Sequence, residues 1–318
     1  MSDDLPFTGE RFVPGVPGEI WVEHWHRYHF ASRWAAGRET IDVACGEGYG
    51  TALLARAAAR VTGVDVSKQA IEHATKAYAA LANARFVEAS CTQLPFADAS
   101  IDLAVSFETI EHIDGQERFL DELARVLRPD GILLLSCPNK LEYSDKRNYS
   151  NEFHVKELYR EELASLVAAR FPHAQWFGQR PTFYSVIAPE GDADNAGQLI
   201  ESSEKAPQEK RGTLSNPLYF LVAASRSGHA PERIAPPLSV FADRDDWAYN
   251  DYVKVFRDLQ ATAGRARAVE HELATLREHC AAIESELVDM KQREAEQLRE
   301  QLHAASSTRR AGWKRWLK

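Results

Sequence analysis

The run IDVACGEGYG, residues 41–50, places three glycines at alternate positions among two carboxylates. These glycines are Gly46, Gly48 and Gly50. They allow tight turns and a close approach of a ligand to the backbone. A loop that binds a pyrophosphate holds an anion over a helix N-terminus, and Asp42 and Glu47 would oppose that anion. The loop therefore favours a ligand that carries positive charge.

S-adenosylmethionine fits such a loop because it has a sulfonium and an α-ammonium group and no phosphate. Its carboxylate suits the N–H groups of the loop. Asp65 ends the next apolar segment and can accept both ribose hydroxyls of the cofactor. NAD sites use an acidic residue in the same way, so Asp65 fits either cofactor. Helix capping is the other role open to Asp65, although Ser67 is the better cap.

A second group of reactive side chains occurs in SFETIEHI, where Glu108, Glu111 and His112 fall close together on a helical turn. His112 is the better general base at neutral pH, with Glu108 as a second catalytic candidate. In the alternative, Glu108 bonds the cofactor or the loop backbone and His112 only begins a helix. His154, in NEFHVKEL, is a third candidate base or acceptor contact; alternatively, Asn151 caps a helix whose first turn holds His154.

The aromatic segment VEHWHRYHF, residues 22–30, predicts an amphipathic lid helix over the ligand cleft. Its candidate contacts with the acceptor are His26, Arg27 and Tyr28, joined by Asn151 and His154 from the later segment. Plain core packing is the alternative. The His-x-His pair lacks a suitably spaced acidic or cysteine partner, and the four cysteines show no CxxC spacing, so we expect no metal site.

The net charge of −9 over 318 residues argues against general nucleic-acid binding. The acidic N-terminus has no apolar stretch of the kind found in signal peptides, and no apolar run approaches 18 residues. These features predict a cytoplasmic protein with no bilayer-spanning segment.

Apolar segments alternate with amphipathic ones and predict an α/β fold with a parallel, doubly wound, Rossmann-like sheet. The expected strands are 40–45, 61–66, 84–90, 100–108, 131–138, 173–179 and 217–225. The expected helices are 21–37, 50–59, 67–80, 116–127 and 155–170. The carboxyl ends of such strands form the ligand crevice, which is where the loop 44–50 falls.

The pattern predicts further regions on either side of this core. They are an N-terminal arm and lid helix (1–37), the α/β domain (38–226) with a mobile insertion at about 189–212, a linker (227–250), a coiled coil (251–305) and a basic amphipathic tail (306–318). The coil is predicted by a heptad seam. Its positions are Val255, Leu259, Thr262, Ala266, Val269, Leu273, Leu276, Cys280, Ile283, Leu287 and Met290. We expect a homo-oligomer, either a dimer or a trimer.

The tail combines basic residues with Trp313 and Trp316, which suits the surface of an anionic membrane. This pattern predicts peripheral contact with the inner face of the cytoplasmic membrane. A solvated, disordered tail is the alternative.

The segments DVACGEGYGT, GVDVS, LPFADASID and RVLRPDGILLLSCPN resemble, in order and spacing, the motifs of class I S-adenosylmethionine-dependent methyltransferases of the type 11 and 12 groups. The resemblance covers residues 38–226 and implies a seven-stranded sheet. It implies that the loop 44–50 holds the methionine part of S-adenosylmethionine, Asp65 the ribose, and the turn at Ser90 and Cys91 the adenine. Many relatives have Asp at the position of Ser90. The implied cofactor residues are Asp42, Ala44, Cys45, Gly46, Glu47, Gly48, Gly50, Asp65, Val66, Ser90, Cys91, Phe107 and Glu108.

A narrower resemblance rests on FTGERFVPG, EHWHRYHFA, SFETIEHI and NEFHVKEL. These segments are similar to methyltransferases of bacterial surface-polysaccharide systems, including O-antigen chain terminators of lipopolysaccharide that carry a coiled coil. The resemblance implies a glycan or lipid-linked glycan acceptor and glycosyltransferases as partners. The alternatives are an acceptor that is a soluble small molecule or nucleotide sugar, and a coiled-coil scaffold with a methyltransferase-like fold.

Overall fold

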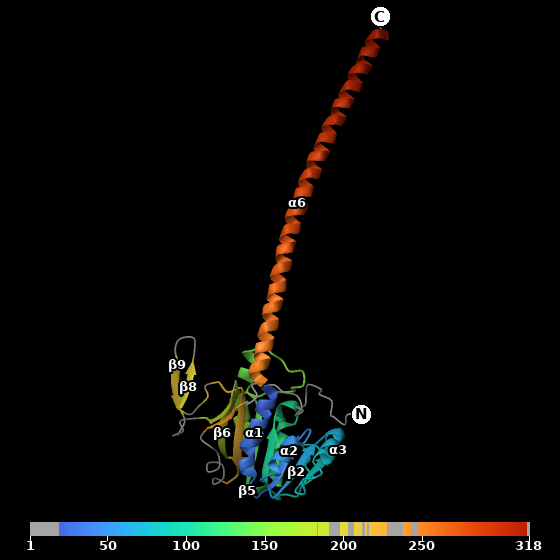
Figure 1. Cartoon of the computed structure of the whole chain (residues 1–318). Coiled ribbons are helices and arrows are strands. Elements are labelled where there is room, and N and C mark those ends of the chain that lie inside the picture. Colours follow the sequence, from blue (N-terminus) through green and yellow to red (C-terminus); the bar gives the residue numbers. More distant parts are fainter. Residues whose placement is uncertain are drawn as a thin grey trace. The chain divides into compact units, whose positions relative to one another are not determined.

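The structure is a computed structural model that describes residues 19–182, 184–190, 198–202, 207–211, 214, 216–227, 238–242 and 247–316. It divides into two compact units, residues 1–251 and 252–318 (Figure 1). The predicted N-terminal arm up to residue 18 lies outside the described residues, and so does part of the predicted insertion and linker.

The first unit contains strands and short helices in alternation, as predicted. Its helices are α1 (Glu19–Ala35), α2 (Tyr49–Leu54), α3 (Lys68–Ala77), α4 (Gln116–Val126) and α5 (Arg160–Ala168), with single turns η1 (Ile110–His112) and η2 (Leu141–Asp145). Its strands are β1 (Glu39–Val43), β2 (Arg60–Asp65), β3 (Ala84–Glu88), β4 (Ile101–Phe107), β5 (Leu127–Pro138), β6 (His173–Pro181), β7 (Tyr184–Pro189), β8 (Gln198–Ser202), β9 (Pro207–Arg211), β10 (Tyr219–Ser225) and β11 (Ser239–Ala242).

The main sheet of the described residues has nine strands in the order β11-β7-β6-β10-β5-β4-β1-β2-β3, so the expected count of seven is wrong. All seven expected strands are present. The two additional strands, β7 and β11, extend the sheet beyond β6. Both are short, and β11 pairs with β7 from within the predicted linker. A separate antiparallel pair, β8 and β9, falls within the predicted insertion.

Parallel pairing joins β3, β2, β1, β4 and β5, whereas β10 is antiparallel to both β5 and β6. Because β1 pairs with β2 on one side and β4 on the other, the chain reverses its direction of winding at β1. Ligands of open α/β sheets bind at this point, beyond the carboxyl ends of the strands.

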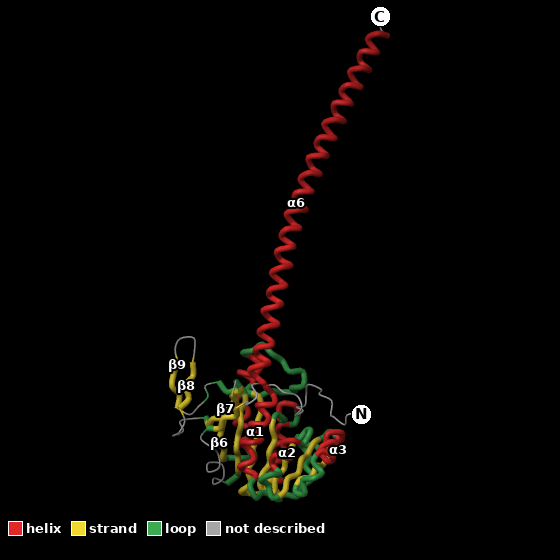
Figure 2. Tube along the Cα trace, in the orientation of Figure 1, coloured by secondary structure: helices red, strands yellow, loops and turns green. Residues whose placement is uncertain are grey.

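Apolar residues on both faces of the sheet form two separate core clusters. Along β5, Ile132 and Leu134 belong to one cluster, while Leu133 and Leu135 belong to the other. Successive side chains of a strand point to opposite faces, so helices must cover both. The first cluster includes residues of α1 and α2, which lie across the face seen in Figure 2, and the second includes residues of α4 and α5.

The segment 151–158 is not helical in the structure. It makes turns and a bridge between Asn139 and Leu158, and α5 begins only at Arg160. The alternative in which Asn151 caps a helix is therefore wrong; its Oδ1 instead accepts a hydrogen bond from the backbone N–H of Phe153, at 3.1 Å. The segment is held by the carbonyl of Glu111, which accepts from the N–H groups of Val155 and Lys156 at 2.8 and 3.0 Å.

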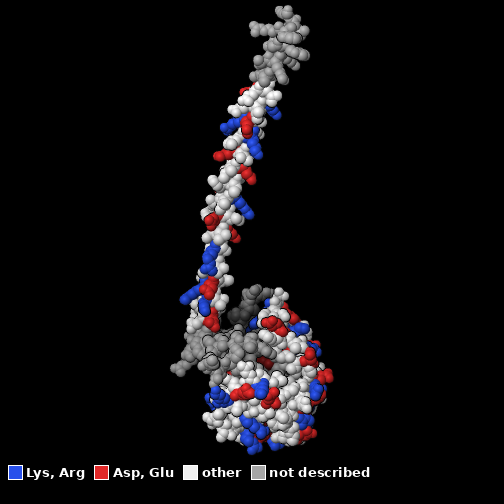
Figure 3. Space-filling model, turned by 90° about the vertical axis from the view of Figure 1, so that its right-hand side faces the viewer, with Lys and Arg blue, Asp and Glu red and all other residues white. Residues whose placement is uncertain are grey.

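The second unit is the long part of α6 (Trp247–Trp316), a helix of 70 residues. Heptad residues from Val255 to Met290 are exposed along it, including Leu273 and Leu276 at 49% and 55%. Acidic and basic side chains are interspersed along the helix (Figure 3). Their association as a coiled coil stays a prediction. In the part of the chain that the structure describes, no helix is both long and apolar enough to cross a bilayer.

Candidate functional site

A cavity of about 340 Å³ lies at the carboxyl ends of β1, β2 and β4. The predicted site residues that line it are Arg27, Tyr28, Ala44, Cys45, Gly46, Glu47, Asp65, Val66, Cys91, Phe107, Glu108, His112, Asn151 and His154. The predicted site residues that lie outside its lining are His26, Asp42, Gly48, Gly50 and Ser90. The loop, the acidic turn after β4, the first helix and the segment at residues 151–154 thus meet at one place.

The loop after β1 has the backbone geometry that its glycines suggest. Gly48 has φ +95°, and a Cβ at this position would lie 2.8 Å from the Ala74 side chain and 2.9 Å from the Phe86 ring. Both the left-handed backbone and the close packing require glycine there. Gly46 and Ala44 also have positive φ values, 54° and 64°. Gly48 therefore shapes the loop, while Ala44 and Gly46 face the cavity.

Asp65 stands where a ribose acceptor is expected. Its carboxylate accepts hydrogen bonds from the N–H groups of Gly46 and Ser67, at 2.9 and 2.8 Å, and lines the cavity. Ser67 caps α3 through Ala70 N–H at 3.3 Å, so Asp65 is not needed as the cap. The two backbone bonds orient the carboxylate, and each oxygen retains acceptor capacity for a ribose hydroxyl.

Glu47 lies in the cavity wall and is bound on its other side by the protein. His73 Nε2 is 2.9 Å from Oε1, and the Tyr78 hydroxyl donates to both carboxylate oxygens at 3.1 and 2.9 Å. The N–H of Tyr49 donates to Oε2 at 3.1 Å. The carboxylate is therefore held rigidly beside the loop, where it opposes an anionic ligand and suits a cationic one.

Asp42 and Gly50 support the cavity from beneath. Asp42 is fully buried and accepts hydrogen bonds from the hydroxyls of Tyr28 and Thr51, at 3.0 and 2.7 Å. A Cβ on Gly50 would lie 2.1 Å from Tyr28 Cζ. Both residues therefore position Tyr28, which itself lines the cavity. Burial raises the pKa of Asp42 to about 6.

The lid helix α1 brings Arg27 into the cavity wall. Its Nη1 lies 2.8 Å from Glu108 Oε1, and Glu23 lies 3.9 Å from Nη2. The guanidinium stacks on the Tyr219 ring at 4.6 Å, yet none of its nitrogens makes a well-directed hydrogen bond. Burial alone would lower the pKa of Arg27, but the carboxylates of Glu108 and Glu23 offset this and hold it above its ordinary value.

Glu108 follows β4 with a left-handed backbone, φ +51°, which is uncommon for a residue with a side chain. Ser136 donates a 2.6 Å hydrogen bond to Oε1, the oxygen that also faces Arg27. The carboxylate is thus fixed by a hydroxyl and a guanidinium. Such partners stabilise its charged form, which suits contact with a cation better than proton abstraction.

His26 points away from the cavity and anchors the added strands. Its two ring nitrogens lie 2.8 Å from Ser185 Oγ in β7 and 3.0 Å from Ser239 Oγ in β11. Burial, with the charge of Arg27, lowers its pKa to about 3. His26 therefore stays neutral and joins α1 to the edge of the sheet.

The turn expected to hold adenine contributes Ala89 and Cys91 to the cavity, whereas Ser90 is exposed and bonds Thr92 at 2.9 Å. Burial raises the pKa of the Cys91 thiol, which keeps it uncharged. An adenine at this turn would therefore contact apolar surface and backbone rather than the Ser90 side chain.

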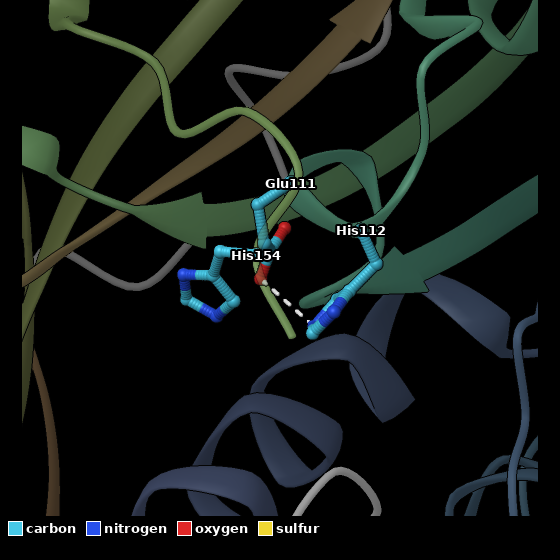
Figure 4. A group of neighbouring side chains, drawn as sticks. All are labelled: Glu111, His112 and His154. Carbon is cyan, nitrogen blue, oxygen red and sulfur yellow. Dashed lines mark ion pairs between the residues drawn. The ribbon is translucent and has the colours of Figure 1, made fainter. Parts of the chain in front are cut away.

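Glu111, His112 and His154 converge at the end of the cavity remote from the loop (Figure 4). His112 Nδ1 lies 2.9 Å from the Phe153 carbonyl and therefore donates to it, which leaves Nε2 facing Glu111 Oε1 at 3.9 Å. The two imidazoles make an edge-to-face contact at 4.9 Å. Burial raises the pKa of Glu111 well above its usual value, and the Glu108 charge adds to this.

Sequence reasoning did not identify four aromatic or histidine residues of the cavity wall. They are His24, Tyr49, Tyr143 and Tyr219. Tyr219 lies in a strand that reads as core, and its hydroxyl donates to Glu23 Oε2 at 2.9 Å from 196 positions away. Tyr49 was available inside the loop motif, where an aromatic residue between two glycines is a usable signal.

A groove of about 470 Å³ adjoins the cavity and shares Ile20, Glu23, Tyr143 and Tyr219 with it. Arg147 and Tyr149 complete its polar and aromatic lining, with Leu218. Tyr149 is 51% exposed, and its ring lies 5.7 Å from that of Tyr143 in an edge-to-face contact. The groove thus extends the histidine-rich end of the cavity with tyrosine rings.

Residues 41–135 match the family described as Methyltransferase domain. A probable S-adenosylmethionine-dependent methyltransferase of Mycolicibacterium smegmatis is 37% identical over 210 residues, which cover 64% of this chain and 78% of that protein. The O-methyltransferase resE of Aspergillus sclerotiorum is 37% identical over 116 residues, 33% of this chain and 44% of its own length. The YcgJ protein of Bacillus subtilis, a solved structure, is 19% identical with a TM-score of 0.46, covering 64% of this chain and all of that one.

Proposed function

The chain belongs to the S-adenosylmethionine-dependent methyltransferases, and we propose that it transfers the methyl group to a hydroxyl of a glycan. When bound, S-adenosylmethionine supplies a methyl group made electrophilic by the sulfonium sulfur. Asp65 would hold the ribose, the loop 44–50 the methionine part, and the turn at Ala89 and Cys91 the adenine. The acceptor would occupy the end of the cavity that Glu111, His112 and His154 line.

The groove beside this end of the cavity carries the proposal of a glycan acceptor. Sugar rings have apolar C–H faces that pack on aromatic rings, and hydroxyls that bond phenol and guanidinium groups. Tyr143, Tyr149 and Tyr219 offer such rings, and Arg147 such donors. The proposal includes acceptors of surface-polysaccharide and O-antigen assembly, lipid-linked ones among them, with glycosyltransferases as partners, which the narrower sequence resemblance implies.

A sugar hydroxyl must lose its proton as it is methylated. His112 is the candidate general base, because its Nδ1–H is bound to the Phe153 carbonyl and its Nε2 is therefore the basic nitrogen. His154 is placed similarly: its Nδ1 lies 2.6 Å from Glu157 Oε1, and its Nε2 lies 3.1 Å from the Asn151 amide nitrogen. Arg27 would hold Glu108 in place beside the transferred group.

Labelled S-adenosylmethionine, incubated with a panel of glycans, lipid-linked sugars and nucleotide sugars, tests the proposal. Tyr149→Ala should lower kcat/KM for the glycan and leave the affinity for S-adenosylhomocysteine unchanged. Tyr184→Ala removes an exposed tyrosine from β7, outside the groove, and is the matched control. Equal effects of the two substitutions, or transfer confined to acceptors without sugar, would contradict the glycan assignment.

A soluble small molecule with a hydroxyl group is the second candidate acceptor. The similarity of a third of this chain to the O-methyltransferase of Aspergillus sclerotiorum favours it. Such an acceptor would fit inside the cavity without using the groove, so Tyr149→Ala would leave its methylation unchanged.

We also propose that the heptad residues of α6 associate as a coiled-coil dimer or trimer. An apolar stripe exposed over several heptads is unfavourable in water, and a second copy of the same helix covers it. The proposed membrane contact of the basic tail rests on side chains beyond residue 303, which lie outside the described side chains. Release of the protein from anionic liposomes on deletion of residues 306–318 would support that contact.

A further inference from the structure

Glu111 is a buried carboxyl group without a hydrogen-bond partner in the described part of the chain. It is 1% exposed, and neither of its carboxylate oxygens accepts a hydrogen bond. A buried carboxyl group left unpaired costs several kcal/mol or more in stability unless something compensates it. Its position in the cavity wall means that a ligand can supply that compensation.

Two imidazoles lie next to this carboxyl group. One ligand atom each of Glu111, His112 and His154 lies within 4.8 Å of the other two. Figure 4 shows the Glu111 carboxylate between the two rings. Two donors of one tetrahedral zinc ion lie roughly 3.3 Å apart, because each is about 2.0–2.1 Å from the metal. Side-chain adjustments of about 1–1.5 Å would therefore bring the three groups to one ion.

Both histidines also have the outer hydrogen bonds that metal ligands use. His112 Nδ1 donates to the Phe153 carbonyl at 2.9 Å, and His154 Nδ1 donates to Glu157 Oε1 at 2.6 Å. Such bonds fix the ring orientation and direct the lone pair of Nε2 toward a metal. The remaining bond, 3.1 Å between the Asn151 amide and His154 Nε2, is one that an ion would replace.

We propose that Glu111, His112 and His154 bind one divalent first-row transition-metal ion, such as zinc or manganese, at the acceptor end of the cavity. Two imidazoles and one carboxylate suit these ions better than calcium or magnesium, which prefer oxygen donors alone. This site replaces the expectation, drawn from residue spacing, that the chain has no metal ligands. His154 is 42 positions from His112, so the cluster forms only when the segment 151–158 is bound by the Glu111 carbonyl.

The use of this ion in catalysis rests on the proposed function. Three protein ligands leave coordination positions for the acceptor hydroxyl, whose pKa a bound cation lowers. The hydroxyl proton leaves to water, the acceptor oxygen bonds the methyl carbon, and the carbon–sulfur bond breaks with its electron pair on sulfur. In this arrangement His112 is a ligand and no longer the general base.

Metal binding is measured on the untagged full-length chain, stripped with a chelator and titrated separately with Zn²⁺, Mn²⁺ and Mg²⁺ in a calorimeter. We expect one Zn²⁺ or Mn²⁺ per chain and weaker binding of Mg²⁺. Glu111→Gln and His154→Gln should each abolish stoichiometric binding. Glu157→Gln, which removes only an outer hydrogen bond, should weaken it by about 10–100-fold.

His173→Gln is the matched control, because His173 is an exposed histidine on β6 away from the cavity. It should bind the ion as the wild type does. Retained affinity for S-adenosylhomocysteine shows that each variant is folded. Failure of the wild type to bind Zn²⁺ or Mn²⁺, or equal losses in His173→Gln and His154→Gln, would overturn the proposal. Because binding is measured without acceptor, it stands or falls separately from the glycan assignment.

Discussion

Acidification should stabilise the N-terminal unit through Asp42. Its carboxyl group is fully buried at the end of β1. Burial raises its pKa from 3.8 to about 6, Asp65 adds to the rise, and hydrogen bonds from Thr51 and Tyr28 oppose it. The folded state therefore binds the proton more tightly than the unfolded state. The resulting stability is fully present below pH 3.8 and is lost as the pH rises through about 6.

The magnitude follows from the two pKa values. Their difference, 6 − 3.8 = 2.2, corresponds to about 3 kcal/mol at about 1.4 kcal/mol per pKa unit. About 2 kcal/mol of this develops between pH 7.5 and 4.5. Asp42→Asn removes the titration but leaves the other ionisable groups in place, including Asp65, Tyr28, Tyr49 and Cys45 around it.

The assay is urea unfolding, followed by tryptophan fluorescence, of the wild type and Asp42→Asn at several pH values. The free energy of unfolding of the wild type, minus that of the variant, should increase by about 2 kcal/mol as the pH falls from about 7.5 to 4.5. Titrations common to both proteins cancel in this difference. A difference that stays constant or decreases on acidification would refute the assignment of a raised pKa to Asp42.

Three further perturbations test the cofactor site, the packing beneath it and the second unit. Asp65→Ala should weaken S-adenosylhomocysteine binding by about 100-fold or more in calorimetry, since hydrogen bonds to a charged group contribute about 1.5–3 kcal/mol each; unchanged affinity would exclude Asp65 as the ribose ligand. Gly50→Ala should lower the unfolding free energy by about 1–3 kcal/mol, because the added methyl overlaps the Tyr28 ring. The loss should shrink in a Tyr28→Leu background, and persistence of the full loss would point to another cause. Substituting Leu273 and Leu276 by Glu should convert an oligomer to a monomer in sedimentation experiments, and a monomeric wild type at micromolar concentration would contradict the coiled coil.

The order of elements was predictable because each strand of the sheet centre is an apolar run long enough to be recognised alone. The segments at β1, β2 and β5 are buried on both faces and therefore nearly continuous in apolar residues. The edge strands β7 and β11 escaped prediction for the opposite reason. They are short, they lie among prolines, and their pairing is fixed by each other and by His26 rather than by a pattern of their own.

The site was predictable where its residues lie within one motif and unpredictable where it depends on long-range contacts. Asp65 and Gly46 follow strands that the sequence reveals, and they bond each other in the structure at 2.9 Å. Arg27, by contrast, owes its position to Glu108 and Tyr219, which occupy other elements of the fold. Spacing alone pairs neither of these with a helix near the N-terminus.

The structure changes the physical reason for expecting a cationic cofactor. The sequence argument counted Asp42 and Glu47 as free negative charges beside the ligand. Asp42 instead lies outside the cavity and bonds two hydroxyls, while Glu47 shares its charge with His73 and Tyr78. Glu47 still excludes a pyrophosphate from the loop, because it remains in the cavity wall.

Most of the negative charge at the cavity lies at its other end. Glu23, Glu108 and Glu111 all line it there, and Arg27 is the basic side chain among them. One guanidinium does not balance three carboxyl groups, so this end accommodates further positive charge. A sulfonium beside Glu108 and a divalent ion at Glu111 would each supply part of it. The acidic character first noticed in the glycine loop therefore selects the cofactor locally, while the turn after β4 sets the charge of the reaction space.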